Sequence, residues 1–414
     1  MNNRWVALAI IFVSFIQFTL NWFCIIPAFG AIVGEMRLSF AQVGGIVGAF
    51  IAGYGIAHIP GGSIAERYGM RTAMLLGIAV ETAGAGLSAW APTLGTLLAA
   101  RFVCGVGGSI YLGSAVGLTA AWFRGRELAT ANGLVTGVAF TVGAATGLFG
   151  WGSIVGALGW REALLAGAAV GLLTLALMAA AFPKPPGNEA VASHGGADSL
   201  RRVFGSATLW IMGLAFLGAY GSYFSAAQLL PHYAQERFGL DHAGAEAVSV
   251  VLLVSGIPGA FAGGWLADRV LGAVPTFLAA CAVEGVALLL VPHLGLLGLE
   301  AAAAAIGAAA ITAFVVWVSI PGQQRDAFRV SDIPTAAGLM LTVVAVGGAV
   351  VPPLYSQIAA GWGFGAAWAF KGLACLGFAA LALLAPRPGR TAAVVPAGAA
   401  GGRRAFAIRA GRQE

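Results

Sequence analysis

The sequence predicts an all-α membrane protein with twelve transmembrane helices in two pseudo-symmetric six-helix halves. Hydrophobic residues make up 59% of the 414 positions and charged residues only 9%, whereas soluble domains carry about a quarter charged residues. The hydrophobic residues fall in twelve runs, each close to the length of about 20 residues that a helix needs to cross a bilayer. A charged turn at 61–72 recurs at 263–272 with an offset of 202, which indicates that one hydrophobic unit is built twice.

The twelve apolar runs predict the spans in chain order. Lipid offers no partner for unpaired backbone groups, and no run alternates as a barrel strand does, so each run must form a helix. The first run has no small-residue cleavage site, and we interpret it as a span and not as a removed signal peptide. The expected spans lie near 5–27, 41–60, 72–91, 94–121, 128–156, 161–182, 207–231, 245–266, 273–292, 295–320, 333–358 and 364–386.

Polar stretches divide the chain into four parts. The long polar interruption that begins at Pro183 predicts a cytoplasmic linker over 183–206. It separates an N-terminal six-helix half, 1–182, from a C-terminal six-helix half, 207–386. The last segment, 387–414, mixes Ala, Gly, Pro and Arg without a helical period and predicts a disordered basic C-terminal tail.

The distribution of basic residues explains the pI near 9.5 without a nucleic-acid partner. Of the 22 basic residues, 17 lie in the termini or in alternate loops, whereas the opposite loops hold only Arg37, Arg161 and Arg237. This asymmetry is the positive-inside bias of membrane proteins, and it predicts that both termini are cytoplasmic. We therefore expect membrane lipid as a partner and no nucleic acid.

Cysteine and histidine give no sign of a catalytic or metal centre. The four cysteines lie inside apolar runs without paired spacing, which argues against a disulfide framework or a metal site. The five histidines are scattered along the chain and do not gather with a nucleophile. We predict no enzyme activity, no catalytic residue, no metal and no cofactor.

The duplicated turn carries a recognisable pattern. In the first copy Gly62, Arg67, Gly69 and Arg71 match the pattern G-x-x-x-D-R-x-G-x-R-[RK], with Glu66 at the Asp position. Its second copy matches at Gly264, Asp268 and Arg269. This pattern resembles the loop between helices 2 and 3 of the major facilitator superfamily. The resemblance implies a secondary transporter of a bacterial-type inner membrane, in which these two loops act as conformational switches and do not bind the cargo.

Polar and aromatic side chains within the spans are candidates for a substrate cavity. Gln17 and Asn21 lie on one face of the first span together with Ser14. The first helix of each half faces the central cavity in the resembled family, so we expect a cavity lining; the alternative is hydrogen bonding between helices alone. The predicted lining residues are Gln17, Asn21, Tyr54, Tyr111, Tyr220, Tyr223, Gln228 and Trp317.

Four ionisable residues fall within spans: Glu81, Arg101, Glu284 and Lys371. Arg101 begins an R-x-x-x-G-x-G element that resembles one in the fourth helix of the superfamily, where the arginine is linked to proton coupling or to helix stability. One interpretation pairs Glu81 with Arg101 and Glu284 with Lys371, so that each charge is neutralised away from water. The other gives these residues a direct part in binding the substrate or a proton.

The resemblance implies alternating access driven by a proton or counter-substrate gradient, since no phosphate-binding Gly-x-x-x-x-Gly-Lys-[Ser/Thr] loop is present for ATP. A W-F-x-x-[RK] element beginning at Trp122 resembles those of organic-acid carriers, so a small anion or organic acid is the first expectation, with a proton or counter-anion as the coupled partner. Proton-coupled efflux of amphipathic drugs is the alternative, although Leu148 replaces the proline typical of drug antiporters. We expect a symporter or antiporter that acts as a monomer. A receptor or scaffold on the same fold remains a further alternative.

Overall fold

The computed structural model describes residues 3–38, 40–124, 127–183 and 196–385, and those ranges are helical with short turns and contain no strand. Eleven stretches in them are long and apolar enough to cross a membrane, and the last, Val330–Leu384, is two helices joined at Gly363. The predicted twelve-helix architecture is thereby confirmed. The predicted linker residues 184–195 and the predicted tail 387–414 lie outside the described residues.

The N-terminal half runs from α1 to α9. Its elements are α1 (Asn3–Phe23), α2 (Phe29–Met36), α3 (Phe40–Tyr68), α4 (Met70–Ala89), α5 (Leu94–Phe123), α6 (Leu128–Asn132), α7 (Phe140–Ala145), α8 (Trp151–Leu158) and α9 (Trp160–Ala181). Two π-helical segments, Gly133–Ala139 and Thr146–Gly150, join α6, α7 and α8 into one span.

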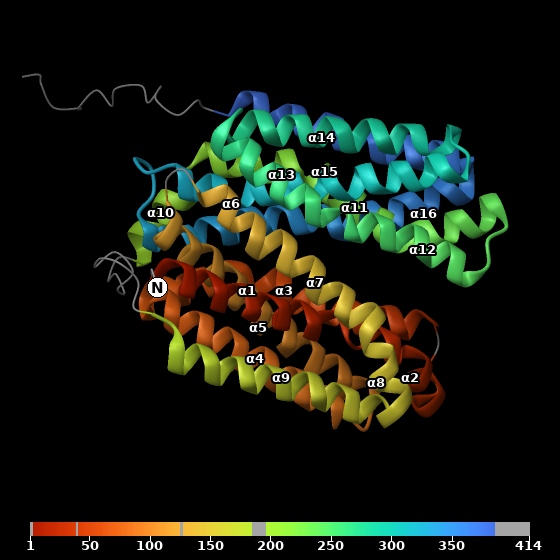
Figure 1. Cartoon of the computed structure of the whole chain (residues 1–414), viewed down its shortest axis with the longest axis horizontal. Helices are drawn as coiled ribbons and strands as arrows, with labels where there is room; N and C mark the ends of the chain where they lie inside the picture. The colour runs from red at the N-terminus through yellow and green to blue at the C-terminus, as the bar shows by residue number, and fades with distance from the viewer. Residues whose placement is uncertain (1–2, 39, 125–126, 184–195, 386–414) are drawn as a thin grey trace, which may run out of the picture.

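The C-terminal half runs from α11 to α16, preceded by a short helix. Within the predicted linker, Gly196–Phe204 form this helix, α10. The elements of the half are α11 (Ala207–Phe238), α12 (His242–Val254), α13 (Gly256–Arg269), α14 (Ala273–Leu290), α15 (Leu296–Gln323) and α16 (Ile333–Ala379). In Figure 1 the two halves lie one above the other, and α10 lies at the same end as the N-terminus.

The same glycine turn occurs four times. Gly69, Gly159, Gly272 and Gly363 have φ between 83° and 95° and ψ between 144° and 170°, and each stands at the start of a helix. Residues with a Cβ rarely adopt this conformation, so glycine lets the chain reverse sharply just before the next helix begins. Gly69 and Gly272 occupy equivalent places in the two halves, and so do Gly159 and Gly363.

Two equivalent crossings bring the halves together at one end. Gly62 on α3 lies against the backbone of Thr335 on α16, and Gly264 on α13 lies against the backbone of Thr130 on α6. At either glycine an added Cβ would lie 2.7 Å from a Thr backbone atom. We call this the closed end; it also holds the start of α1 and the end of α9, and the other end is called the opposite end.

Candidate substrate cavity and closed-end contacts

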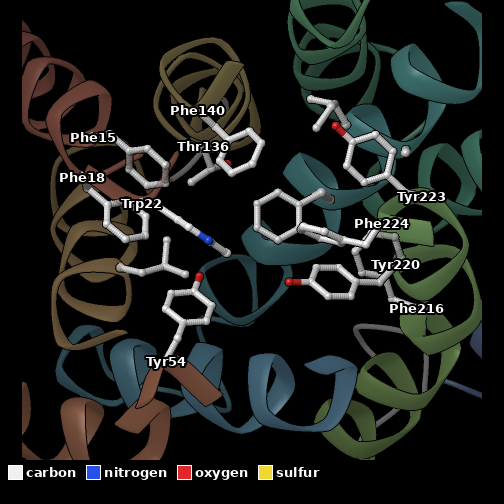
Figure 2. A pocket seen from close by; sticks show the side chains of 14 residues that line it. Phe15, Phe18, Trp22, Tyr54, Thr136, Phe140, Phe216, Tyr220, Tyr223 and Phe224 are labelled. Atoms are coloured by element: carbon white, nitrogen blue, oxygen red, sulfur yellow. The ribbon is translucent and has the colours of Figure 1, made fainter. Parts of the chain in front are cut away.

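A deep cavity lies between the two halves, with about 530 Å³ of empty space that includes space open to solvent (Figure 2). Its walls come from α1, α3, α5 and the π-helical span of one half and from α11 and α15 of the other. The lining residues are Phe15, Phe18, Trp22, Tyr54, Leu112, Thr136, Phe140, Phe216, Tyr220, Tyr223, Phe224, Ala310, Ile311 and Phe314.

Aromatic rings dominate this cavity, and none of its fourteen lining residues is Asp, Glu, Lys, Arg or His. The polar groups are few: Figure 2 shows the hydroxyls of Tyr54 and Tyr220, one from each half, pointing into the space between them. The ring of Tyr54 stacks on Phe18 with centroids 6.2 Å apart, and Tyr220 packs against Phe224 at 4.7 Å. The arrangement can hold a flat apolar body between rings and offers it a small number of hydrogen bonds.

An outer cavity of about 960 Å³ adjoins the deep one and shares Trp22, Phe140, Tyr223 and Phe224 with it. Arg101 is its charged lining residue. The guanidinium donates to the carbonyls of Asn21 at 3.2 Å and Trp22 at 2.8 Å, which lie where α1 ends, and it stands 4.9 Å from the Phe50 ring. Arg101 thus satisfies two carbonyls that the helix end leaves without intrahelical partners.

The structure places half of the eight predicted lining residues at the cavities. Tyr54 and Tyr220 line the deep cavity, Gln228 the outer cavity and Tyr223 both. The other four make contacts between helices. Gln17 donates to Glu81, Asn21 lies against Gly167 of α9, Tyr111 bonds Ser14 and the Ile11 carbonyl, and Trp317 donates to the Met212 carbonyl.

The face of α1 that lines the deep cavity is not the polar face that the sequence predicted but the face next to it. Phe15, Phe18 and Trp22 line the deep cavity, each one position after Ser14, Gln17 and Asn21. A step of one residue turns about 100° around a helix, so the polar face is directed at α4, α5 and α9 instead. The missed signal was the aromatic spacing i, i+3, i+7 itself.

The intramembrane charges do not form the ion pairs that one interpretation predicted. Among the described residues, no salt bridge within 4.0 Å joins Glu81 to Arg101 or Glu284 to Lys371. Glu81 accepts a hydrogen bond from Gln17 at 3.0 Å. The Nζ atom of Lys371 lies 3.3 Å from the ring centre of Trp368 and 4.0 Å from that of Tyr355, so this amino group packs against ring faces and not against a carboxylate.

The second copy of the switch turn holds the halves together. Asp268 at the end of α13 accepts from the backbone N–H of Ala129 at 3.1 Å, the N–H of Thr130 at 2.7 Å and the Thr130 hydroxyl at 2.8 Å. The acceptor carboxylate thus comes from one half, and the N–H groups begin α6 of the other. A carboxylate at a helix N-terminus satisfies unpaired N–H groups and interacts favourably with the helix dipole.

The first copy is built differently. Glu66 is buried at the matching position, but the residue equivalent to Ala129 is Pro334, which has no N–H to donate. Arg71 donates to the Ala179 carbonyl of its own half at 2.9 Å, and the Arg67 guanidinium lies 5.4 Å from the Tyr68 ring. Arg269 follows Asp268 at the last position of α13.

Comparison with known proteins identifies the family. The family model described as Major Facilitator Superfamily matches residues 11–325. The chain belongs to this superfamily. Solved superfamily structures agree: FucP in the outward conformation has a TM-score of 0.77 at 16% identity, covering 93% of this chain and 100% of that one. The human organic anion transporter MFSD10 has a TM-score of 0.75 at 15% identity, covering 92% and 100%. At these identities the likeness concerns the fold alone.

Curated superfamily relatives match over part of their length. The MFS-type transporter Rv1250 of Mycobacterium tuberculosis is 31% identical over 45% of this chain and 32% of its own length. RibZ, a riboflavin transporter of Clostridioides difficile, is 24% identical over 45% and 40%. The methylenomycin A resistance protein of Bacillus subtilis is 26% identical over 41% and 36%. The chain thus spans less than half the length of these three relatives. With its apolar helices, this superfamily member is an integral membrane protein.

The helix α10 adds a contact at the closed end. Arg202 on α10 makes two hydrogen bonds to the carboxylate of Asp332, at 2.9 and 3.1 Å, and Asp332 is fully buried just before α16. Asp332 also accepts from the Arg329 N–H at 2.9 Å. Two parallel bonds from one guanidinium fix both distance and orientation. Arg202 therefore ties the segment between the halves to the side of α16 that meets α3.

We expect Arg202→Gln to weaken this end of the molecule. The change leaves a buried carboxylate without its cation, and a cost of about 1–3 kcal/mol raises the open population roughly fivefold to a hundredfold. The readout is maleimide labelling of Ser319→Cys, because Ser319 is buried at the junction of the halves and accepts from Asn132 at 2.8 Å. Arg201→Gln on the exposed face of α10 is the matched control. Equal labelling rates in the two variants would remove Arg202 from the closing contacts.

Proposed function

We propose that this protein is a secondary active transporter that moves an organic compound with an apolar, ring-bearing body by alternating access. The observation that carries the proposal is the aromatic deep cavity between the halves, which contains no charged lining residue. A proton or counter-substrate gradient supplies the energy. The cavity meets an outer cavity away from the closed end, which supports a conformation open to one side only.

The distribution of basic residues supports the orientation. Both termini and the switch turns face the cytoplasm of a bacterial-type inner membrane under the positive-inside rule. The closed end is then the cytoplasmic end, and the outer cavity opens away from the cytoplasm. This protein acts as a monomer in the proposal, because the cavity is complete within one chain.

The residues that line the deep cavity favour a different class of cargo from the one that the sequence favoured. A small hydrated anion would lose its water in the deep cavity without meeting a cation, which is costly. Amphipathic compounds, the alternative from the sequence, gain apolar contacts there instead. Relatives named as a riboflavin transporter and as a methylenomycin A resistance protein are compatible with this choice.

An organic acid is the second candidate, and Arg101 is the observation that favours it. Its guanidinium lines the outer cavity, and its Nε atom has no hydrogen-bond partner. A ring-bearing acid could place its body in the deep cavity and its carboxylate toward Arg101. MFSD10, named as an organic anion transporter, shares the fold.

Transport into proteoliposomes separates the candidates. The probes are ethidium, riboflavin, benzoate and succinate, each measured with and without an imposed pH gradient. The proposal is supported if ring-bearing probes are transported and succinate is not. If benzoate is the one ring-bearing probe transported, the organic-acid candidate is selected. Transport of succinate alone would overturn the preference for a ring-bearing body. Absence of transport of all four would favour a receptor or scaffold role.

We expect Phe140→Ala to weaken binding of a ring-bearing probe about tenfold, because loss of a ring contact costs about 1 kcal/mol or more. Phe140 lines both cavities. The measurement is the KM for whichever probe is transported. Phe149→Ala is the matched control, since Phe149 lies in the same span but is 47% exposed on the outer face. A larger change in the control than in Phe140→Ala would contradict the assignment of the cavity.

A further inference from the structure

We propose that Glu81 binds the coupling proton, and that Gln17 transmits the protonation state of Glu81 to the residues that line the cavity. The inference rests on the proposed transport function and deepens it. Its basis is the position of a buried carboxyl behind the cavity, joined to α1 by one hydrogen bond. The nearby cavities lack a carboxyl of their own.

The first step concerns where a proton could bind. Neither cavity has an Asp, Glu or His among its lining residues. The fully buried carboxyls of the described chain are Glu66, Glu81, Glu284 and Asp332. Glu66 and Asp332 lie at the closed end, so Glu81 and Glu284 are the two at the middle of spans. They are equivalent positions of the two halves, on α4 and α14.

Glu81 is distinguished from Glu284 by its link to a cavity helix. Gln17 of α1 donates from Nε2 to Glu81 Oε2 at 3.0 Å. Gln17 precedes Phe18, whose ring lines the deep cavity, and lies just over one turn before Trp22, which lines both cavities. Glu284 has no such bond, because neither of its carboxyl oxygens has a hydrogen-bond partner.

The Gln17 side chain can serve both states of the carboxyl group. Its NH₂ group already donates one hydrogen bond to Glu81, whereas its Oε1 and the Oε1 of Glu81 are both buried without a partner. A proton on Glu81 Oε1 supplies the hydrogen that these two acceptors lack, so the acid and the amide can form a second hydrogen bond. Uptake of the proton therefore tightens the contact between α1 and α4, and its release loosens it.

Arg101 gives Glu81 a second connection, to the outer cavity and to the end of α1. Arg101 lines the outer cavity and holds the Asn21 and Trp22 carbonyls at the end of α1. In the proposal the proton comes from the side of the outer cavity, because Arg101 lines that cavity and its charge acts on Glu81. The ionisable groups facing Glu81 from α1 and α5 are Cys24, Arg101, Cys104 and Tyr111.

The elements α3 and α9 add no further charge next to this carboxyl. His58 of α3 is bonded through Nδ1 to Ser109, and the charged residues of α9, Arg161 and Glu162, lie at the opposite end. The helices α4 and α5 are in backbone contact at Gly107 and the Glu81 N–H, so the group is held in a fixed place. A proton at Glu81 consequently acts on α1 and Arg101 above all.

The test measures conformation and needs no substrate. Nitroxide labels on Trp90→Cys and Leu297→Cys, which are 71% and 81% exposed at the opposite end of the two halves, report the distance between the halves in the full-length protein. A sample without these two substitutions measures any reaction of the four buried native cysteines. Distance distributions are recorded from about pH 5 to about pH 8.

We expect the population of the two distances to shift with pH in the parent protein and in Glu284→Gln. In Glu81→Gln the distribution should be the same at both ends of the pH range and match the parent at low pH, because glutamine mimics the protonated acid. Glu81→Asp should keep the shift with a displaced midpoint, which guards against a folding defect in the glutamine variant. A parent protein without a shift, or a shift retained in Glu81→Gln, would overturn the proposal. Neither result depends on which probe is transported.

Discussion

Replacing Gly62 by valine is expected to abolish transport while leaving the protein folded. A Cβ at this position would lie 2.7 Å from the backbone N of Thr335, a backbone atom that cannot move aside without shifting α16. Overpacking costs about 1–3 kcal/mol or more, so closure at this end should become at least about tenfold to a hundredfold rarer. The clash disappears when the halves separate, and the fold of each half is therefore preserved.

Two measurements check this outcome. Uptake of the transported probe should fall to background, and labelling of Ser319→Cys should become fast because the closed end stays open. Gly55→Val is the matched control on the same helix, since nothing lies within 4 Å of a Cβ at Gly55. If transport is lost but labelling of the Gly62 variant stays slow, valine does not act by disrupting the crossing of α3 with α16.

The second large effect is expected for Asp268→Asn, which should slow turnover far more than it weakens binding. The asparagine amide can accept through one oxygen only, so its NH₂ group would face the N–H of Ala129 or Thr130. Hydrogen bonds to a charged group contribute about 1.5–3 kcal/mol each, and losing one with the charge shifts the closed population by roughly ten- to a hundredfold. Cargo binding should change little, because Asp268 lies outside both cavities.

Comparison of turnover with equilibrium binding of the same probe tests this prediction. Thr130→Val serves as the graded control, because it removes the hydroxyl donor at 2.8 Å but keeps both backbone donors. Its slowing should be the smaller of the two. Equal losses of turnover and binding in Asp268→Asn would show that the residue acts on the cargo site and not on closure.

Much of the fold could be predicted because the bilayer leaves few alternatives. Run length determined the spans, and the duplicated turn showed that the halves are equivalent. The runs also separated the last two spans, 333–358 and 364–386, and the backbone of Gly363 breaks the helix between them. The short helix α10 was missed, since its polar segment resembles a linker in composition.

The cavity could be predicted only in part, because the polarity of a side chain in a membrane helix does not show whether it faces a cavity or a neighbouring helix. A polar group in a membrane needs a partner, and a neighbouring helix provides one as well as a water-filled cavity does. Gln17 donates to Glu81 and Trp317 donates to a carbonyl, so both side chains lie behind the residues that line the cavity. The same ambiguity applies to the ion-pair interpretation, because the Lys371 amino group packs against rings and Arg101 donates to carbonyls.

Pro334 makes the two repeats mechanically unequal. The crossing at Asp268 is secured by atoms of the repeats themselves, whereas the crossing at Glu66 lacks one backbone donor and is supported through Asp332 by Arg202. Arg202 belongs to a segment outside both repeats. We therefore expect α10 to be more than a passive tether, because its bond to Asp332 should bias which end of the protein is closed at rest.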